Sequence, residues 1–202
     1  MKLQMKNTLE IENNCIEKGY KLIAGVDEAG RGPLAGPVVS ACVIMPLDDI
    51  IEGVDDSKKL SEKKRDFLFD KIIEKAIAYK ISVVSEKVID EINILNATKM
   101  SMKECIEGME IKPDIVLVDA VKLEMEVPCV PIIHGDALSY SIAAASILAK
   151  VSRDRIMQEY DKVYPQYLFA KHKGYGTKMH IEAIKEHGSC EIHRKTFITR
   201  FI

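Results

Sequence analysis

The sequence predicts a mixed α/β sheet flanked by helices. Short apolar runs rich in β-branched residues alternate with longer segments whose apolar residues recur at helical spacing. In chain order these segments read strand, strand, helix, strand, helix, strand, strand, helix, helix, which indicates this fold class. The chain has 202 residues, 47% hydrophobic and 30% charged, an ordinary balance for one domain with a full core.

The first two strands are expected at residues 22–26 and 38–45. The run LIAGV ends at Asp27, and the run VVSACVIM is rich in β-branched residues. The glycines and prolines of EAGRGPLAGP, residues 28–37, predict a turn or a shaped loop between the strands. The polar residues 7–19 before them are expected to form a short helix or an irregular lead-in.

The middle of the chain predicts two helices around a third strand. Residues 61–78 favour an amphipathic helix with Ser61 as its N-cap. Its apolar residues at helical spacing are Phe67, Leu68, Ile72, Ile73 and Ala76. A strand is expected at 81–84, and a second helix at 92–109, which stops before Pro113.

Two further strands are expected in the second half. Residues 115–118 predict a strand that terminates at Asp119. Residues 127–133 predict another, and its prolines indicate an edge position. Asp136 then precedes a long helical stretch at 137–160. Small residues of this stretch would allow close packing on the sheet: Ala143, Ala144, Ala145 and Ser146.

The C-terminal part predicts a helical extension of the core. After Pro165 a loop that carries HKGYGT leads to a last helix at about 177–187. We therefore expect a single domain over residues 1–202, with its core at about 20–163 and the extension at about 164–202.

Composition argues against a membrane or disulfide-stabilised protein. No apolar run approaches the roughly 18 residues that span a bilayer, and the polar opening does not resemble a signal peptide. The five cysteines are scattered without zinc-ligand spacing, which favours reduced, mostly buried thiols. We expect a cytoplasmic protein that contacts no membrane.

The charge is unevenly distributed around a formal net charge of −2. From Lys150 onward the chain has 11 Lys and Arg against 6 Asp and Glu, whereas residues 1–149 have 18 against 25. A basic third on an acidic body is compatible with phosphate binding beside a metal-loaded carboxylate site. Lysine-rich surface helices without any ligand would give the same count.

Three acidic residues follow predicted strands, namely Asp27, Asp119 and Asp136. Strand ends in such sheets open onto the crevice where ligands bind. Because three buried carboxylates repel one another, a divalent cation among them is expected, and oxygen ligands favour Mg²⁺ or Mn²⁺. Each acid alone has a structural alternative, since Asp136 could cap a helix, Asp119 open a turn and Asp27-Glu28 belong to a loop. All three together favour the metal site.

The loop GRGPLAG at residues 30–36 matches neither phosphate-binding glycine motif. Its third glycine is one place late for a dinucleotide fingerprint and a strand follows, and Gly-Lys-Ser/Thr of a Walker A loop is absent. Glycines would let its backbone approach a ligand, with Arg31 at its middle. A plain strand connection is the alternative, but the place directly after Asp27-Glu28 favours a ligand contact.

Several long motifs now resemble ribonuclease HII, the type 2 ribonuclease H family. They are VDEAGRGPLAGPVV, DDSKKLSEKKR, VLVDA, GDALSYSIAAASILAKVSRDRIM, HKGYGT and IHRKTF. The motifs run from Ala24 to Phe197 in the family's order. The resemblance implies a ribonuclease H-like, mixed five-stranded sheet flanked by helices, with a C-terminal helical extension.

The resemblance also implies site residues. The metal-binding, catalytic carboxylates would be Asp27, Glu28, Asp119 and Asp136, with Asp27 and Asp136 as the inner or bridging ligands of two Mg²⁺ or Mn²⁺ ions. Substrate contacts would come from Gly30, Arg31, Gly32, Tyr175, Lys58, Ser146 and Lys150. His134 and Gly188-Ser189 depart from the commonest family pattern, and His134 would either tune metal or phosphate binding or simply be accommodated.

The implied activity is two-metal hydrolysis of phosphodiesters in RNA/DNA hybrids and 5′ of single ribonucleotides in duplex DNA, which leaves 5′-phosphate and 3′-hydroxyl ends. We expect a monomer. A metal-dependent phosphatase or phosphotransferase is one alternative, but it would not explain Gly-Arg-Gly together with HKGYGT. A non-catalytic nucleic-acid-binding module is another, but binding alone would favour removal of acids near phosphates.

Overall fold

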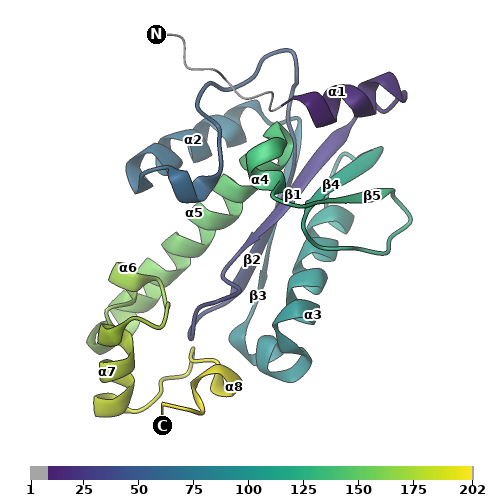
Figure 1. Cartoon of the computed structure of the whole chain (residues 1–202). Helices are drawn as coiled ribbons and strands as arrows, with labels where there is room; N and C mark the ends of the chain where they lie inside the picture. Colours follow the sequence, from purple (N-terminus) through teal and green to yellow (C-terminus); the bar gives the residue numbers. More distant parts are fainter. Residues whose placement is uncertain (1–8, 202) are drawn as a thin grey trace.

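The computed structural model describes residues 9–201, which fold around one five-stranded sheet (Figure 1). Its strands are β1 Ile23–Ala29, β2 Val38–Ile44, β3 Ala78–Val84, β4 Ile115–Asp119 and β5 Cys129–Ile132. They lie in the order β3-β2-β1-β4-β5. The β1–β2 and β2–β3 pairs are antiparallel, whereas β1–β4 and β4–β5 are parallel. The predicted mixed sheet, with the fifth strand at an edge, is confirmed.

Helices cover both faces of the sheet (Figure 1). They are α1 Glu10–Glu17, α2 Glu62–Lys75, α3 Glu86–Glu107, α4 Gly135–Leu138, α5 Tyr140–Val163, α6 Phe169–His172, α7 Lys178–His187 and α8 Lys195–Ile198. On one face α2 and α5 pack on Ala41 and Val43 of β2. On the other, α3 packs on Cys42 and Ile44 of the same strand. The alternation of side chains along β2 thus divides the core into two layers.

Close packing of α5 on β1 depends on small residues, as predicted. A Cβ at Gly25 would collide with the backbone of Ser141 at the start of α5. The stretch Ala143–Ala145 and Ser146 are buried. Because close packing brings α5 across β1, the acidic residues of β1 lie next to this helix.

Side-chain caps define the starts of the longer helices. Hydroxyl oxygens of four cap residues each accept a hydrogen bond from a backbone amide in the first turn: Ser61, Ser85, Ser139 and Thr177. The prediction of Ser61 as a cap is confirmed, and Thr177 marks the predicted start of α7. Each such cap stabilises its helix by about 1 kcal/mol.

Several predicted boundaries were wrong. The helix predicted over 61–78 ends at Lys75, and Phe67 on it is exposed while Phe69 is buried. The helix predicted over 92–109 begins at Glu86 and is kinked at Asn93, whose φ of 65° lies in the left-handed region. Its true start is set by the cap at Ser85, a signal that the apolar pattern alone does not carry.

The helix predicted over 137–160 is two helices. Its first part is α4, which contains Asp136, and Ser139 interrupts the helix and caps α5. The buried Glu12 of α1 accepts hydrogen bonds from the Ser139 hydroxyl and the Ser141 amide at 2.5 and 2.9 Å. This contact 127 residues away in the chain holds the junction. Asp136 is therefore not an N-cap.

Strand β1 does not end at Asp27 as predicted. It continues to Ala29, because β2 pairs with it as far as Ala29 and Val39. The parallel partner β4 stops at Asp119. Glu28, predicted in the loop, is therefore a strand residue.

The C-terminal extension gathers around the C-terminal end of α5, beside the turn that joins β1 and β2 (Figure 1). The predicted last helix is α7, but α8 follows it. Leu34 and Ala35 of the turn share a buried cluster with Tyr167, Phe169 and other residues of the extension. Residues 7 and 8 of the predicted lead-in lie outside the described residues. No helix within residues 9–201 has the length and apolarity needed to cross a membrane.

Candidate active site

Three carboxylates from three elements meet at one edge of the sheet. Asp27 lies on β1, Asp119 ends β4 and Asp136 lies on α4. The parallel register pairs Val26 with Val118, so Asp27 and Asp119 are the next residues on neighbouring strands. One oxygen of each carboxylate lies within 4.8 Å of the other two. We call these three residues the acidic edge.

Burial and mutual repulsion act on the acidic edge. Desolvation raises the pKa of Asp27 well above its ordinary value, and the charges of Glu28 and Asp119 raise it further. Desolvation also raises the pKa of Asp119, although the Gly135 amide, 2.8 Å from its Oδ1, opposes this. Positive charge near such a cluster therefore stabilises it.

Lys58 supplies that charge in the chain itself. Its Nζ lies 2.8 Å from Oδ2 of Asp136, and this hydrogen bond raises the pKa of Lys58. The side chain is 73% exposed, so the ammonium can leave the carboxylate at little cost. It occupies the acidic edge as a monovalent cation would.

Glu28 lies beside the acidic edge but is not part of its close group. Its Oε1 is 3.4 Å from Nη1 of Arg31, while its Oε2 is buried without a hydrogen-bond partner among residues 9–201. Burial raises the pKa of Glu28. A buried carboxylate oxygen without a partner is costly, and a bound cation would satisfy it.

The donor set fits a hard divalent cation. Every candidate ligand atom is a carboxylate oxygen, the type that Mg²⁺ and Mn²⁺ prefer. The fit rests on the clustered carboxylates, the unpaired oxygen of Glu28 and the ammonium of Lys58 among them.

Ser146 and Lys150, the other predicted contacts on α5, lie deeper. Ser146 is 3% exposed, its hydroxyl is 2.7 Å from that of Ser57, and it lowers the pKa of Asp27 by a hydrogen bond. Lys150 bonds Oδ1 of Asp154 at 2.7 Å, and burial lowers its pKa. Ser146 thus stabilises the Asp27 carboxylate by a hydrogen bond, and Lys150 is paired with Asp154 of the same helix.

The predicted Gly-Arg-Gly segment and Tyr175 come together. Arg31, Gly32 and Tyr175 are all exposed, with Tyr175 at 44%. A Cβ at Gly32 would lie 3.8 Å from Cε1 of Tyr175. The Leu34 amide donates to the Gly174 carbonyl at 2.8 Å, which ties the glycine loop, residues 30–37, to the segment that carries Tyr175.

Two buried arginines that sequence reasoning missed hold the glycine loop from inside. Arg153 of α5 is 1% exposed and donates to the carbonyls of Ala35, Pro37 and Lys173. Arg194 is fully buried and donates to the carbonyls of Gly30, Arg31, Gly36 and Pro37. We call them the arginine pair.

The arginine pair explains why Gly30 is a glycine. Its φ is 102°, and a Cβ there would collide with Nε of Arg153. Burial lowers the pKa of Arg153 to about 10 and that of Arg194 to about 9. Both residues lie in the motifs SRDRIM and IHRKTF, but no spacing rule distinguishes a buried arginine from a surface one.

His134 lies at the border of the acidic edge. It is exposed, has a left-handed φ of 57°, and its carbonyl accepts a hydrogen bond from Ala137 at the start of α4. This geometry turns the chain from β5 into α4 and so places Asp136.

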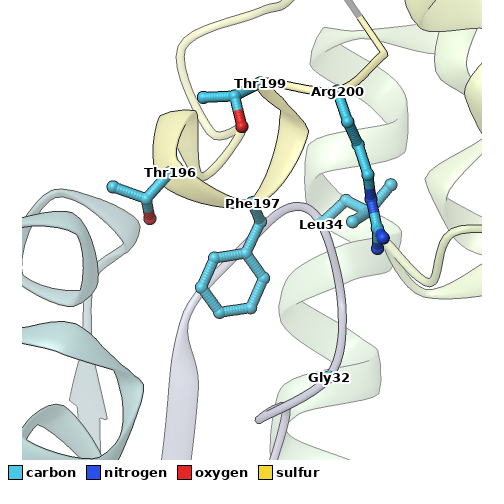
Figure 2. A pocket seen from close by; sticks show the side chains of 6 residues that line it. All are labelled: Gly32, Leu34, Thr196, Phe197, Thr199 and Arg200. Atoms are coloured by element: carbon cyan, nitrogen blue, oxygen red, sulfur yellow. The ribbon is translucent and has the colours of Figure 1, made fainter.

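An open hollow of about 420 Å³ lies between the glycine loop and α8. Figure 2 shows the Phe197 ring and the Arg200 side chain extending toward the loop that carries Gly32 and Leu34. None of its lining residues is acidic. The hollow therefore borders the exposed face of the loop, whereas the chemistry of metal binding belongs to the acidic edge.

Comparisons with known proteins identify the family. A family model described as Ribonuclease HII matches residues 24–200. The ribonuclease HII of Ruminiclostridium cellulolyticum is 58% identical over 200 residues, which cover 98% of this chain and 78% of that protein. The ribonuclease HII of Caldicellulosiruptor saccharolyticus is 56% identical over 198 residues, 98% of this chain and 97% of that protein.

Solved structures are similar in fold. The crystal structure of the ribonuclease H2 from Pyrococcus horikoshii OT3 is similar with a TM-score of 0.76 and 29% identity, over 90% of this chain and 99% of that one. The Archaeoglobus fulgidus RNase HII, solved as a complex with PCNA, gives 0.73 and 27%, over 89% and 96%. The chain therefore belongs to the ribonuclease HII family, as a metal-dependent nuclease that hydrolyses phosphodiester bonds.

Proposed function

We propose that the chain cleaves the RNA strand of RNA/DNA hybrids and nicks duplex DNA on the 5′ side of a single embedded ribonucleotide. The products are a 5′-phosphate and a 3′-hydroxyl. Ribonuclease H endonuclease activity follows from family membership. The finer statement rests on one observation: Glu28, beside the acidic edge, lies 3.4 Å from Nη1 of Arg31 in the glycine loop, and Tyr175 lies against Gly32 of the same loop.

Asp27, Asp119 and Asp136, together with Glu28, would hold two Mg²⁺ or Mn²⁺ ions. When bound, such a pair of ions activates the attacking water and stabilises the leaving 3′-oxygen. The four carboxylates therefore hold charge in place, and no side chain of the protein has to act as nucleophile. In this proposal Asp27 and Asp136, the most buried of the set, are the inner ligands.

Lys58 takes a second role when cations replace it at Asp136. Its exposed ammonium is then available to a phosphate of the substrate. Ser146 keeps its place behind Asp27, and Lys150 adds positive charge to the same side of α5.

Selectivity for ribose comes from the exposed face of the glycine loop and from Tyr175. The 2′-hydroxyl is the group that distinguishes the two sugars, and a backbone without side chains can approach it closely. Arg194 of the arginine pair donates to the carbonyls of Gly30 and Arg31 on the inner side, so the loop presents a fixed outer face. Recognition by sugar and phosphate reads no base sequence.

The test is a gel assay on a DNA duplex with one ribonucleotide, with and without Mg²⁺. We expect metal-dependent nicking 5′ of the ribonucleotide, nearly abolished in both Asp27→Asn and Asp136→Asn. Each variant replaces a charged oxygen by a neutral group of the same size. Cleavage at full rate by both variants, or cleavage of an all-DNA duplex at the same rate, would contradict the proposal.

A further inference from the structure

A buried group of histidines lies behind Tyr175. His180 of α7 and His193, which precedes Arg194, are 0% and 2% exposed. The rings of Phe169 and Tyr167 contact them edge-on, with centroids 5.4 and 4.9 Å away. These two aromatic rings restrict the orientation of both imidazole rings.

A continuous chain of hydrogen bonds runs through this pair to Tyr175. The Cys190 amide lies 2.9 Å from Nδ1 of His193. Nε2 of His193 lies 3.0 Å from Nε2 of His180, and Nδ1 of His180 lies 2.9 Å from the Tyr175 carbonyl oxygen. We call His180 and His193, joined in this way, the histidine relay.

The ends of the relay determine every proton inside it. A backbone amide only donates, so Nδ1 of His193 is unprotonated and its Nε2 carries the hydrogen. A carbonyl only accepts, so Nδ1 of His180 carries a hydrogen and its Nε2 accepts from His193. One arrangement of protons satisfies all three bonds, and in it both rings are neutral. A further proton on either ring would place two N–H groups against each other.

The neighbouring groups are consistent with a neutral pair. His172 of α6 stacks on His180 at 4.5 Å, donates from Nε2 to the Tyr167 carbonyl and accepts from the Gly174 amide at Nδ1, so it too is neutral. The other titratable groups nearby are the Cys190 thiol, Asp161 beside His172, and His187 against Tyr167. Burial lowers the pKa of both His180 and His193 to about 4.

We propose that His180 and His193 are positioning residues for Tyr175, which hold its backbone through a one-way relay so that its ring stays beside Gly32. The inference rests on the proposed contact of Tyr175 with the ribonucleotide. The Tyr175 carbonyl also accepts from the Thr177 amide at 2.8 Å, and its own amide donates to the His172 carbonyl at 2.9 Å. The relay adds the bond that connects Tyr175 to Cys190 and to the chain that carries Arg194.

The relay predicts opposite preferences at its two positions. An asparagine amide lies near the place of Nδ1 of histidine, and a glutamine amide near that of Nε2. At position 193 the bond to His180 uses Nε2, so His193→Gln retains it and His193→Asn loses it. At position 180 the bond to Tyr175 uses Nδ1, so His180→Asn retains it and loses only the bond to His193, whereas His180→Gln loses the contact with Tyr175 itself.

The experiment measures kcat and KM for nicking of a DNA duplex with one ribonucleotide, at pH 8 with saturating Mg²⁺. All four variants are made with Tyr175 present and with Tyr175→Ala. With Tyr175 we expect His193→Asn and His180→Gln to lose about tenfold in kcat/KM, and their partners to lose clearly less. With Tyr175→Ala the differences within each pair should shrink to about twofold or less, because coupled residues are not additive.

If Gln is the better residue at both positions, or Asn is the better residue at both, the proposal is contradicted. Such a result would reflect side-chain size alone. Differences that persist undiminished with Tyr175→Ala would also overturn it. Thermal unfolding of each variant identifies any that fails to fold, and either position then suffices with its own pair. If Tyr175→Ala itself leaves nicking unchanged, the proposed role of Tyr175 fails as well. If Tyr175→Ala lowers nicking but the amide order is absent, the relay alone fails.

Discussion

Buried charge is arranged in opposite ways at the acidic edge and at the arginine pair, although β1 leads from the acidic edge into the glycine loop that the arginine pair holds. At the acidic edge, like charges face one another, and an oxygen of the neighbouring Glu28 has no hydrogen-bond partner in the described part of the chain. At the arginine pair, two guanidiniums are buried and form no salt bridge with a described carboxylate, yet seven hydrogen bonds to backbone carbonyls satisfy them.

The difference separates a region that binds from a region that holds shape. A buried cluster that is incomplete by itself gains free energy when a cation enters it. A buried group whose partners are all within the chain gains nothing from a ligand and loses much when one partner is removed. The two regions should therefore respond oppositely to neutral substitutions.

The largest effect is expected from Asp27→Asn. Nicking should fall by about a thousandfold or more, because an inner metal ligand is lost. The folded chain without metal should nevertheless become more stable, by about 1 kcal/mol, since a buried like charge has been removed. Urea unfolding in EDTA measures the stability, and the gel assay measures the activity. A large loss of stability in EDTA would show that the acidic edge is a structural element.

Arg194→Met should destabilise the folded chain, whereas Asp27→Asn should stabilise it. Four hydrogen bonds to the glycine loop are lost and the carbonyls of Gly30 and Gly36 remain buried. We therefore expect the free energy of unfolding, measured with urea, to fall by about 3 kcal/mol or more. Arg194→Lys should not restore it, because an ammonium lacks the planar fork. Arg155→Met is the matched control, since the Arg155 ion pair with Asp66 is 47% exposed on both sides and is worth less than about 1 kcal/mol. Equal losses in the Arg194→Met and Arg155→Met variants would contradict the assigned role.

The sequence predicted the acidic edge better than its support. Asp119 ends an apolar strand and Asp27 follows an apolar run, so both carboxylates could be placed at one sheet edge from local pattern alone. Their pairing across the parallel β1–β4 register agrees with that placement. The family motifs then added Glu28, whose strand position depends on how far β2 extends and is not visible in the apolar pattern.

Residues that hold the site in place from distant parts of the chain cannot be recognised from the local sequence pattern. Nothing in the sequence distinguishes Arg153 and Arg194 from surface arginines. Their burial follows from the packing of the C-terminal extension on α5. The break between α4 and α5 is likewise hidden, since residues 137–160 have continuous helical character and only Glu12 of α1 marks Ser139 as a cap. Tertiary contacts decide such features, and no spacing rule contains them.

Low pH should lower the free energy of unfolding through protonation of His180 and His193 in the unfolded chain. His180 and His193 have a pKa of about 4 when folded, against an ordinary value of 6.5. Between these values the unfolded chain binds more protons, so their contribution to stability is complete above about pH 6.5 and is lost as the pH falls toward 4. Urea unfolding at pH 7.5, 6 and 5 should show a shallower decline for His193→Gln than for the original chain. The exposed His187, replaced by Gln, should leave the decline unchanged.

The smallest effect is expected from Lys58→Met, and it sharpens the comparison because Lys58 is the chain's own cation at the acidic edge. Without metal, loss of the ion pair with Asp136 should lower stability by less than about 1 kcal/mol, since Lys58 is mostly exposed. With saturating Mg²⁺ the difference should vanish, because the bound ions replace the ammonium. Urea unfolding of both chains in EDTA and in Mg²⁺ gives the four values. A loss that is the same with and without Mg²⁺ would mean that Lys58 and the metal do not share Asp136, and the ammonium would then be a structural partner of α4.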